Sequence, residues 1–321
     1  MIKKETSKLF RGLAVIMVVA SHYAEWIDSG GQEELSLWMT KLGAFGVDIF
    51  FFLSGYGLAR AAIKAGVSKE FILRRGFSVY FPYLLVITVL ELIDGIFLSP
   101  DKSWFAYFTG DNYWFMTNLF LFYLFFFFCW KIKVGRNLLL LFLVLIYSYY
   151  LVNIGRLEFW YISNIAFVMG TFVGDKEELW KDRFREAWAK PAGLILVLAS
   201  LYVGKKSFAL PEEMGTLIFL HFLFTLGVML LISKRWFRGG ALSVIGSYSL
   251  YVYLLHTRLF HGMYWKWDML EGIKRWGAVF SCSILISIVV GFISQDIILK
   301  GVQKLWAKDT VKKGAANEKK N

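Results

Sequence analysis

Long apolar stretches recur along this chain from one end to the other, and they constrain its fold more than any other feature. A helix that spans a bilayer needs about 20 consecutive, mostly apolar residues. The stretch at residues 192–204 is the shortest, and it ends on Lys205 and Lys206. We therefore predict an all-α, polytopic membrane protein with about ten transmembrane helices. The stretches that meet or approach the required length are residues 9–27, 42–63, 77–98, 114–130, 137–153, 159–174, 192–204, 215–233, 241–257 and 277–299.

The composition agrees with a chain that lies mostly in lipid. Hydrophobic residues make up 57% of the chain and charged residues 19%, whereas a soluble domain carries about 25% charged residues. Aromatic residues reach 19%, which suits rings that face lipid and the membrane interfaces. Cys129 and Cys282 both lie in apolar stretches, so we expect buried thiols rather than a disulfide framework. The composition excludes a soluble globular domain.

The basic residues are distributed unevenly between the segments that join the apolar stretches. With ten spans and a cytoplasmic N-terminus, the inner segments hold 27 of the 36 Lys and Arg residues, and the outer segments hold nine. An excess of Lys and Arg marks the cytoplasmic side of membrane proteins. We therefore predict that both termini are cytoplasmic. The formal net charge of +12 then reflects topology, which argues against nucleic acid as a partner.

We expect one transmembrane domain over residues 1–306, followed by a lysine-rich, disordered cytoplasmic tail over residues 307–321 that is attracted to anionic lipid. The connection at 175–190 mixes both charges with Trp and Phe. It is typical of an amphipathic helix at the interface, and a solvated linker is the alternative. Gly170 and Gly174 have the spacing of small residues that lets two membrane helices pack closely.

Ionisable side chains inside membrane spans are costly and usually functional, and the first span carries Arg11 and His22. Arg11 and His22 are eleven residues apart, so on a helix they share one face and are separated by about 16 Å along the axis. A cation at the cytoplasmic boundary and an imidazole deeper on the same face would suit an elongated anionic ligand. An arginine that reaches the interface and an unrelated histidine would give the same spacing.

Two further charged sites lie in and after the second span. Asp48 lies at a depth comparable to His22, where a carboxylate would orient the imidazole and raise its basicity. A carboxylate that faces a wet vestibule is the alternative. The adjacent pair Arg74 and Arg75 precedes the third span and is placed to bind phosphate through bidentate hydrogen bonds. Topological anchoring explains most other basic residues of this segment.

All four histidines fall in the predicted outer half of the protein. His22 lies in the first span, His221 in the eighth, and His256 and His261 around the end of the ninth. A metal site needs clustered ligands at short spacing. A spacing of five residues at a helix end is a weak signal, so we expect no metal.

Five segments, taken together and in order, resemble the acyltransferase-3 superfamily of bacterial integral-membrane acyltransferases. The resemblance covers about 300 residues, and one position departs from the pattern, since Ser78 stands where the family usually has a further basic residue. The five segments are Arg11 to His22; Gly46 to Tyr56; Phe71 to Arg75 leading to Tyr80, Pro82 and Tyr83; Tyr113 to Met116; and Ser247 to His256.

The resemblance implies an O-acyltransferase of the bacterial cytoplasmic membrane. It would take acyl-CoA, most often acetyl-CoA, from the cytoplasm and acylate a hydroxyl of a cell-surface glycan at the outer face. His22 and Asp48 would then be catalytic, and Arg11, Arg74 and Arg75 would bind the CoA phosphates. Segments of the family pattern that contain Trp114, Tyr248 and His256 would contact the acceptor.

Other classes of membrane protein explain part of the same pattern. A transporter or flippase accounts equally well for ten helices and buried polar groups, but not for an arginine-to-histidine face comparable in length to a phosphopantetheine arm. A lipid-binding or sensor protein without chemistry is a third alternative. The sequence does not identify the acceptor or the oligomeric state.

Overall fold

The regular elements of this computed structural model are all helices in the part of the chain that it describes, residues 2–24, 33–93, 113–206, 214–232, 240–264, 266 and 272–301. The predicted tail at 307–321 lies outside these residues. In chain order the helices are α1 (Lys4–Ala24), α2 (Glu33–Ala65), α3 (Lys69–Arg75), the π-helix η1 (Gly76–Tyr80), α4 (Phe81–Ile93), α6 (Trp114–Cys129), α7 (Arg136–Asn153), the 3₁₀ helix η4 (Glu158–Trp160), α8 (Asn164–Asp175), α9 (Glu177–Trp180), the 3₁₀ helix η5 (Arg183–Arg185), α10 (Ala189–Lys206), α11 (Met214–Ile232), α12 (Ala241–Ser247), α13 (Ser249–Tyr264), α14 (Gly272–Gly291) and the π-helix η7 (Phe292–Leu299).

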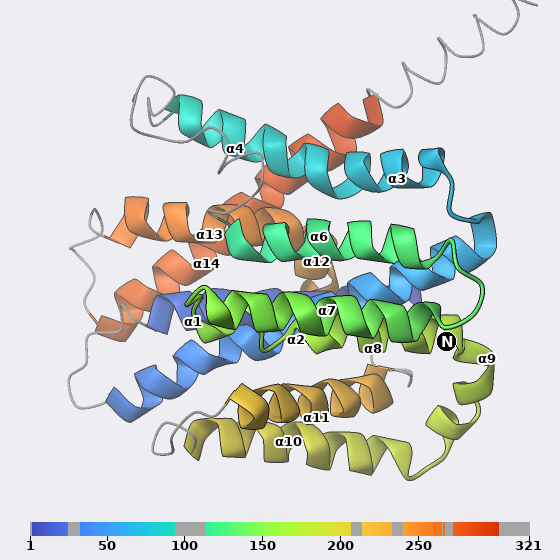
Figure 1. Cartoon of the computed structure of the whole chain (residues 1–321). Coiled ribbons are helices and arrows are strands. Elements are labelled where there is room, and N and C mark those ends of the chain that lie inside the picture. The colour runs from blue at the N-terminus through green and yellow to red at the C-terminus, as the bar shows by residue number, and fades with distance from the viewer. Residues whose placement is uncertain are drawn as a thin grey trace, which may run out of the picture.

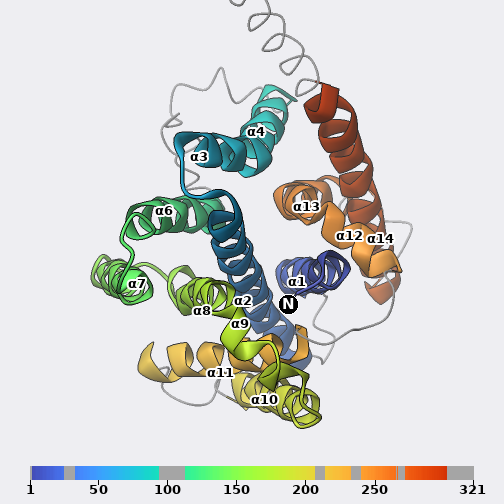
Figure 2. The same ribbon diagram turned by 90° about the vertical axis from the view of Figure 1, so that its right-hand side faces the viewer.

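The long helices form a bundle in which α1 and α2 lie near the middle (Figure 1). Viewed along the bundle, the other long helices surround these two (Figure 2). Helix α2 packs most extensively against α8 and α1, and α1 in turn packs against α12 and α13. The two helices that carry Arg11, His22 and Asp48 are thus enclosed by the rest of the bundle.

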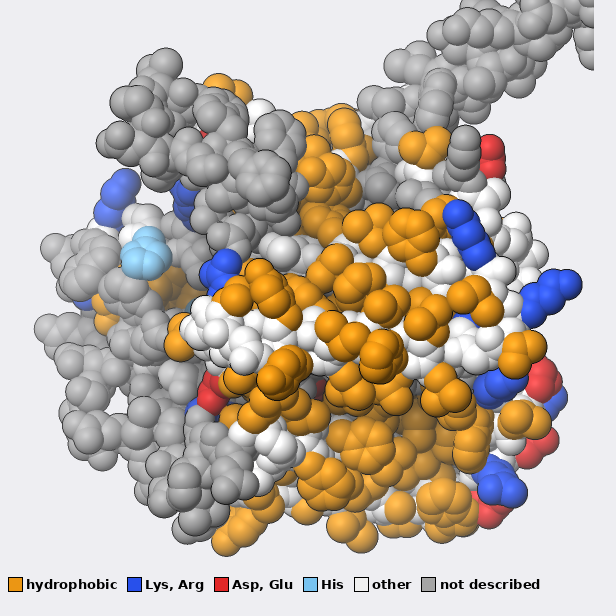
Figure 3. Space-filling view, in the orientation of Figure 1, with side chains coloured by type: hydrophobic (Ala, Val, Ile, Leu, Met, Phe, Trp, Pro, Cys, Tyr) orange, Lys and Arg blue, Asp and Glu red, His pale blue; other side chains and the backbone are white. Residues whose placement is uncertain are grey.

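The outer face of the bundle is apolar, as a lipid-facing surface must be. On α7 the large side chains of Leu138, Phe142 and Leu145 are exposed. Figure 3 shows apolar side chains across the middle of this face, with Lys and Arg side chains towards its right-hand end and at its upper left. In the described part of the chain, four helical segments are long and apolar enough to cross a membrane: Trp38–Ala65, Arg136–Asn153, Met214–Ile232 and Lys274–Leu299.

Each of the ten predicted stretches contains helix, although within the residues that the structure describes only these four segments meet the length and hydropathy required of a span. The shortest predicted stretch, 192–204, is extended on both sides in α10. The stretch at 159–174 begins differently from the prediction, since η4 and a turn precede α8 there. The number of spans and the sidedness of the termini stay predictions.

The connection at 175–190 does not form the continuous amphipathic helix that the sequence favoured. It consists of the four-residue α9, the 3₁₀ helix η5 and turns. Glu177 on α9 is buried, and its carboxylate pairs with Arg60 at 2.7 Å and accepts a hydrogen bond from Tyr56 at 3.1 Å. The segment is therefore fixed to the end of α2, which leaves less of it free to lie along an interface.

Glycines allow two pairs of helices to cross with their backbones in contact. A Cβ atom at Gly170 would lie 2.1 Å from the carbonyl oxygen of Phe52, and one at Gly55 would lie 2.2 Å from that of Phe167. Gly174 approaches the backbone of α2 in the same way, which confirms the close packing predicted from its spacing to Gly170. A second crossing joins α1 to α12 through Gly12 and Gly246, beside the site described below.

We expect Gly170→Ala to destabilise the protein, because the obstructing atom is backbone that cannot rotate away. Overpacking of this kind costs about 1–3 kcal/mol, and the melting temperature of detergent-solubilised protein should fall accordingly. The matched control is Gly277→Ala in α14, where the new methyl group meets nothing within 4 Å. Equal melting temperatures for the two variants would contradict the close crossing of α2 and α8.

Candidate functional site

Helix α1 places the side chains of Arg11 and His22 in two different cavities. Arg11 lines one of them and His22 lines the other. The intervening residues Ala14, Val15, Val18 and Val19 are buried against the neighbouring helices, which fixes the rotation of α1 about its axis. The predicted shared face of Arg11 and His22 therefore opens onto one cavity at Arg11 and onto a second at His22, and the residues between them are packed against other helices.

The first space, here called the cationic cavity, has a volume of about 430 Å³. Among the residues that the structure describes, three cations line it, Arg11 from α1, Arg75 from α3 and Lys300 just after η7, and no Asp or Glu does. Lys300 is paired with Asp296, whereas neither arginine faces a carboxylate among the described lining residues, and positive charges of this kind inside a bundle call for an anionic ligand. The remaining lining residues are Phe50, Leu53, Ser54, Gly57, Ser78, Val79, Pro82, Phe115, Leu119, Tyr123, Gly246, Ser247, Ser249, Leu250, Tyr251, Tyr253, Gln295 and Leu299.

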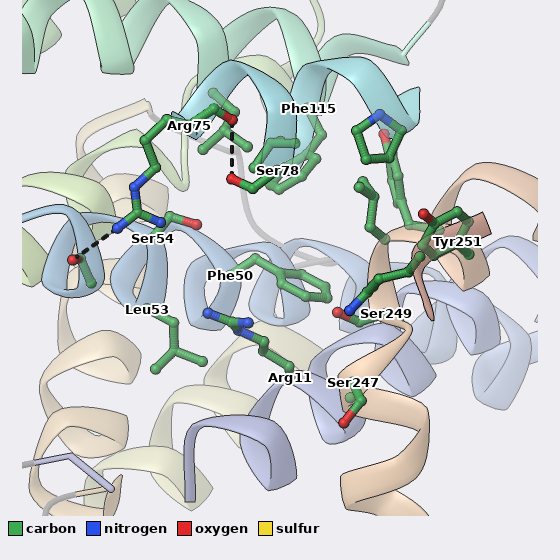
Figure 4. A pocket seen from close by; sticks show the side chains of 18 of the residues that line it. Arg11, Phe50, Leu53, Ser54, Arg75, Ser78, Phe115, Ser247, Ser249 and Tyr251 are labelled. Carbon is green, nitrogen blue, oxygen red and sulfur yellow. Dashed lines mark hydrogen bonds between the residues drawn. The ribbon is translucent and has the colours of Figure 1, made fainter. Parts of the chain in front are cut away.

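Arg75 reaches this cavity because the chain turns back after α2. Gly66 ends that helix in the left-handed conformation, with φ at +72°, and the chain then continues into α3. The guanidinium of Arg75 donates a hydrogen bond to the carbonyl oxygen of Gly57 at 3.3 Å, and its own carbonyl accepts one from Ser78 at 3.1 Å (Figure 4). Arg75 and Arg11 lie close enough to interact electrostatically with each other and with Tyr123.

The two π-helical segments both border the cationic cavity. Ser78 and Val79 line it from η1, and Gln295 and Leu299 line it from η7. Segments of π-helix are rare and occur frequently at functional sites. Lys300 follows η7 and pairs with Asp296, which also accepts a hydrogen bond from Tyr248 at 2.8 Å. The π-helices η1 and η7 and the ion-paired Lys300 thus all border the cationic cavity.

The second space, here called the histidine cavity, has a volume of about 530 Å³ and is lined by His22 and His221. Trp114 also lines this cavity. So do Lys41 and Glu158, which form an ion pair at 2.7 Å. Aromatic rings and a charged pair are suited to binding a polar molecule with apolar faces. The remaining lining residues are Val18, Ser21, Thr40, Gly43, Ala44, Phe45, Val47, Phe159, Ile162, Gly204, Leu217, Leu220 and Tyr253.

Tyr253 lines both cavities and so lies between them. Its backbone carbonyl accepts a hydrogen bond from Nδ1 of His256 at 2.6 Å, and since a carbonyl oxygen can only accept, Nδ1 carries the proton. The buried Nε2 of His256 has no hydrogen-bond partner within the part of the chain that the structure describes. The ring of His256 lies 5.1 Å from that of His22, between centroids. His256 therefore packs beside the His22 ring.

Asp48 does not orient His22 as the sequence suggested. Its carboxylate binds Nδ1 of His221 at 2.6 Å, and Asp48 is fully buried. Similar depth in the membrane does not put two side chains on facing surfaces. Gly46 of α2 faces α1, and Asp48, two residues later, is rotated by about 200° from it. The carboxylate is consequently directed to α11.

A buried polar cluster that sequence analysis missed positions one wall of the histidine cavity. Asn118 donates hydrogen bonds to the Trp160 carbonyl at 2.7 Å and to Asn164 at 3.1 Å, and its own carbonyl oxygen accepts one from Tyr147 at 2.8 Å. These bonds join α6, α7, η4 and α8. Asparagines in apolar stretches at 118 and 164 were the available signal.

The remaining predicted site residues are placed as follows. Trp114 shares the histidine cavity with His22, and Arg75 shares the cationic cavity with Arg11. Tyr248 is not among the lining residues of either cavity, and its hydroxyl binds Asp296 instead. The side chain of Arg74 lies outside the described residues.

The fold and these two cavities define a helical membrane protein with an internal anion site beside a histidine-lined space. The family model of the acyltransferase-3 domain, described as an acyltransferase domain, matches residues 7–294. The chain belongs to this family, and it is a membrane acyltransferase. Comparison with the curated proteins and with the solved structures gave no match.

Proposed function

We propose that the protein transfers an acyl group, most often acetyl, from cytoplasmic acyl-CoA to a hydroxyl of a cell-surface or exported glycan at the outer face of the bacterial cytoplasmic membrane. The observation that carries this proposal is the pair of adjoining cavities. Of the described residues, Arg11, Arg75 and Lys300 line one cavity with no carboxylate among them, two imidazoles line the other, and Tyr253 borders both.

CoA offers chemistry that fits the cationic cavity. Its phosphate groups would bind the arginines, for which planar guanidinium groups are well suited. The arm would then extend along α1, whose rise between Arg11 and His22 is about 16 Å. This direction brings the thioester past Tyr253 towards His22. The sidedness comes from the excess of Lys and Arg on the predicted cytoplasmic side.

The histidine cavity supports the reacting end of the proposal. His22 is exposed to this space and would act either as the base for the acceptor hydroxyl or as the nucleophile that carries the acyl group. Trp114 and Phe159, 5.2 Å apart between ring centroids, offer the apolar surfaces against which a sugar ring stacks. In either route the C–S bond of the thioester breaks and the CoA thiol leaves towards the cytoplasm.

A transfer assay separates this function from the alternative of a transporter or flippase. Membranes that contain the protein are supplied with acetyl-labelled acetyl-CoA on the cytoplasmic side, and the envelope glycans are then extracted. We expect label in ester linkage to glycan and a stoichiometric release of free CoA. Membranes without the protein provide the control. Movement of a glycolipid or small molecule without CoA release would favour the transporter and overturn the proposal.

A further inference from the structure

The histidine cavity holds a second imidazole, and a buried carboxylate binds it. His221 on α11 lines the cavity, is only 3% exposed, and its Nδ1 lies 2.6 Å from a carboxylate oxygen of Asp48. Asp48 itself is 0% exposed and does not line the cavity. The imidazole of His221 therefore lines the cavity where an acceptor would bind, and the buried carboxylate of Asp48 lies on the side of the ring away from the cavity.

The carboxylate fixes the tautomer of the imidazole. An ionised Asp48 can only accept, so Nδ1 of His221 carries the proton and Nε2 presents its lone pair. Among the described residues, the His221 ring makes no hydrogen bond besides the one to Asp48. Because Nδ1 is bonded to a residue outside the cavity, the part of the ring that lines the cavity is the edge opposite Nδ1, which includes Nε2.

Packing holds this ring in place. Phe45 stacks on the imidazole with centroids 4.7 Å apart and planes at 17°, and Phe224 packs against Phe45 in turn. An imidazole held by a carboxylate at one nitrogen and by a ring on its face cannot reorient. Such an arrangement is the one by which enzymes keep a histidine in the tautomer that accepts a proton from a hydroxyl group.

We propose that the Asp48–His221 pair is the general base that activates the acceptor hydroxyl, and that His22 is the nucleophile that carries the acyl group. The inference rests on the proposed function and deepens it. The two imidazoles have separate tasks because His22 lies on the helix that leads from the cationic cavity, whereas His221 enters from α11 at another wall.

The steps balance without a further reactant. A ring nitrogen of His22 bonds to the thioester carbon, the C–S bond breaks, and the CoA sulfur takes the other ring proton of His22. Nε2 of His221 then takes the proton of the acceptor hydroxyl while the oxygen bonds to the acyl carbon. The C–N bond to His22 breaks, and the proton on His221 returns to His22, so both imidazoles are restored.

The test uses His221→Gln, whose amide still donates a hydrogen bond to Asp48 but has no basic nitrogen. We expect transfer to the envelope glycan to fall by about 10²–10⁴-fold. Acetyl-CoA should still release about one CoA thiol per protein molecule in a single burst. A lost general base blocks the second half of the reaction only, whereas a structural defect would abolish the burst as well. His261→Gln, an exposed histidine that lines neither cavity, is the matched control.

Wild-type transfer by His221→Gln, or transfer and burst lost together, would overturn the inference. If His221→Gln does not fold, Asp48→Asn decides in its place, because the amide has the same size and favours the tautomer with the proton on Nε2. The same burst without transfer supports the inference, and wild-type transfer refutes it. A wild-type protein that transfers no acetyl group would instead refute the proposed function itself.

Discussion

His22→Gln should reduce acyl transfer by at least about 10²-fold and leave acetyl-CoA binding unchanged. The imidazole lies at the histidine cavity, about 16 Å by helix rise from the arginine that would bind phosphate. Removing it takes away the reacting nitrogen but no charge from the cationic cavity. The CoA burst should disappear as well, which distinguishes this variant from His221→Gln. The measurements are labelled acetyl transfer and release of CoA thiol.

The surroundings of His22 make this substitution a fair test of chemistry rather than of folding. His22 is exposed to the cavity, while the neighbouring Tyr23 is buried and anchors the end of α1 by hydrogen bonds to Ser283 at 2.6 Å and to the His256 carbonyl at 2.9 Å. His261→Gln again serves as the control. Full acetyl transfer by His22→Gln would remove the histidine from the mechanism and with it the two-step route.

The parts of the site that lie on one helix could be predicted from the sequence. Arg11 and His22 are related by the period of an α-helix, so their common face follows from their spacing alone. The close crossing at Gly170 and Gly174 is predicted for the same reason, since four residues return to one face. Helix positions also follow the apolar stretches, including α10, where the stretch was shortest.

The parts of the site that depend on two helices could not be predicted in this way. Asp48 was assigned to His22 because their depths match, but its partner His221 is 173 residues away on α11. The depth of a side chain in the membrane does not say which neighbouring helix it faces. That also depends on the rotation of α2 about its axis, which cannot be read from the spacing of residues within α2. Gly46 and Asp48 were available as a signal, because a small residue marks the face that contacts another helix.

Lys300 is a further example of what the sequence left open. Ser78 stands where the family usually has a further basic residue, and Lys300 from the far end of the chain lines the same cavity as Ser78. It reaches that position because η7 widens the helix beside the cavity and because Asp296 and Tyr248 hold the segment. Local motifs show which groups are present, and only the packing of α1, α3 and η7 shows that three cations converge.

Arg11→Ala/Arg75→Ala should weaken acetyl-CoA binding by about 10²–10⁴-fold. A hydrogen bond to a charged group contributes about 1.5–3 kcal/mol, and both guanidinium groups border the same cavity without a carboxylate among its lining residues. Removing them leaves Lys300 as the remaining cation at that cavity. Binding is measured on purified protein in detergent, and binding to the wild type should weaken as salt is raised.

The control for this variant is Arg183→Ala in η5, an exposed arginine that lines neither cavity. It changes the charge without touching the site, so its acetyl-CoA affinity should equal that of the wild type. Unaltered binding in the double variant would reduce Arg11 and Arg75 to topological anchors. The His22 variant is assayed for acetyl transfer, whereas the double arginine variant is assayed for acetyl-CoA binding. The roles of His22 and of the two arginines are therefore tested independently of each other.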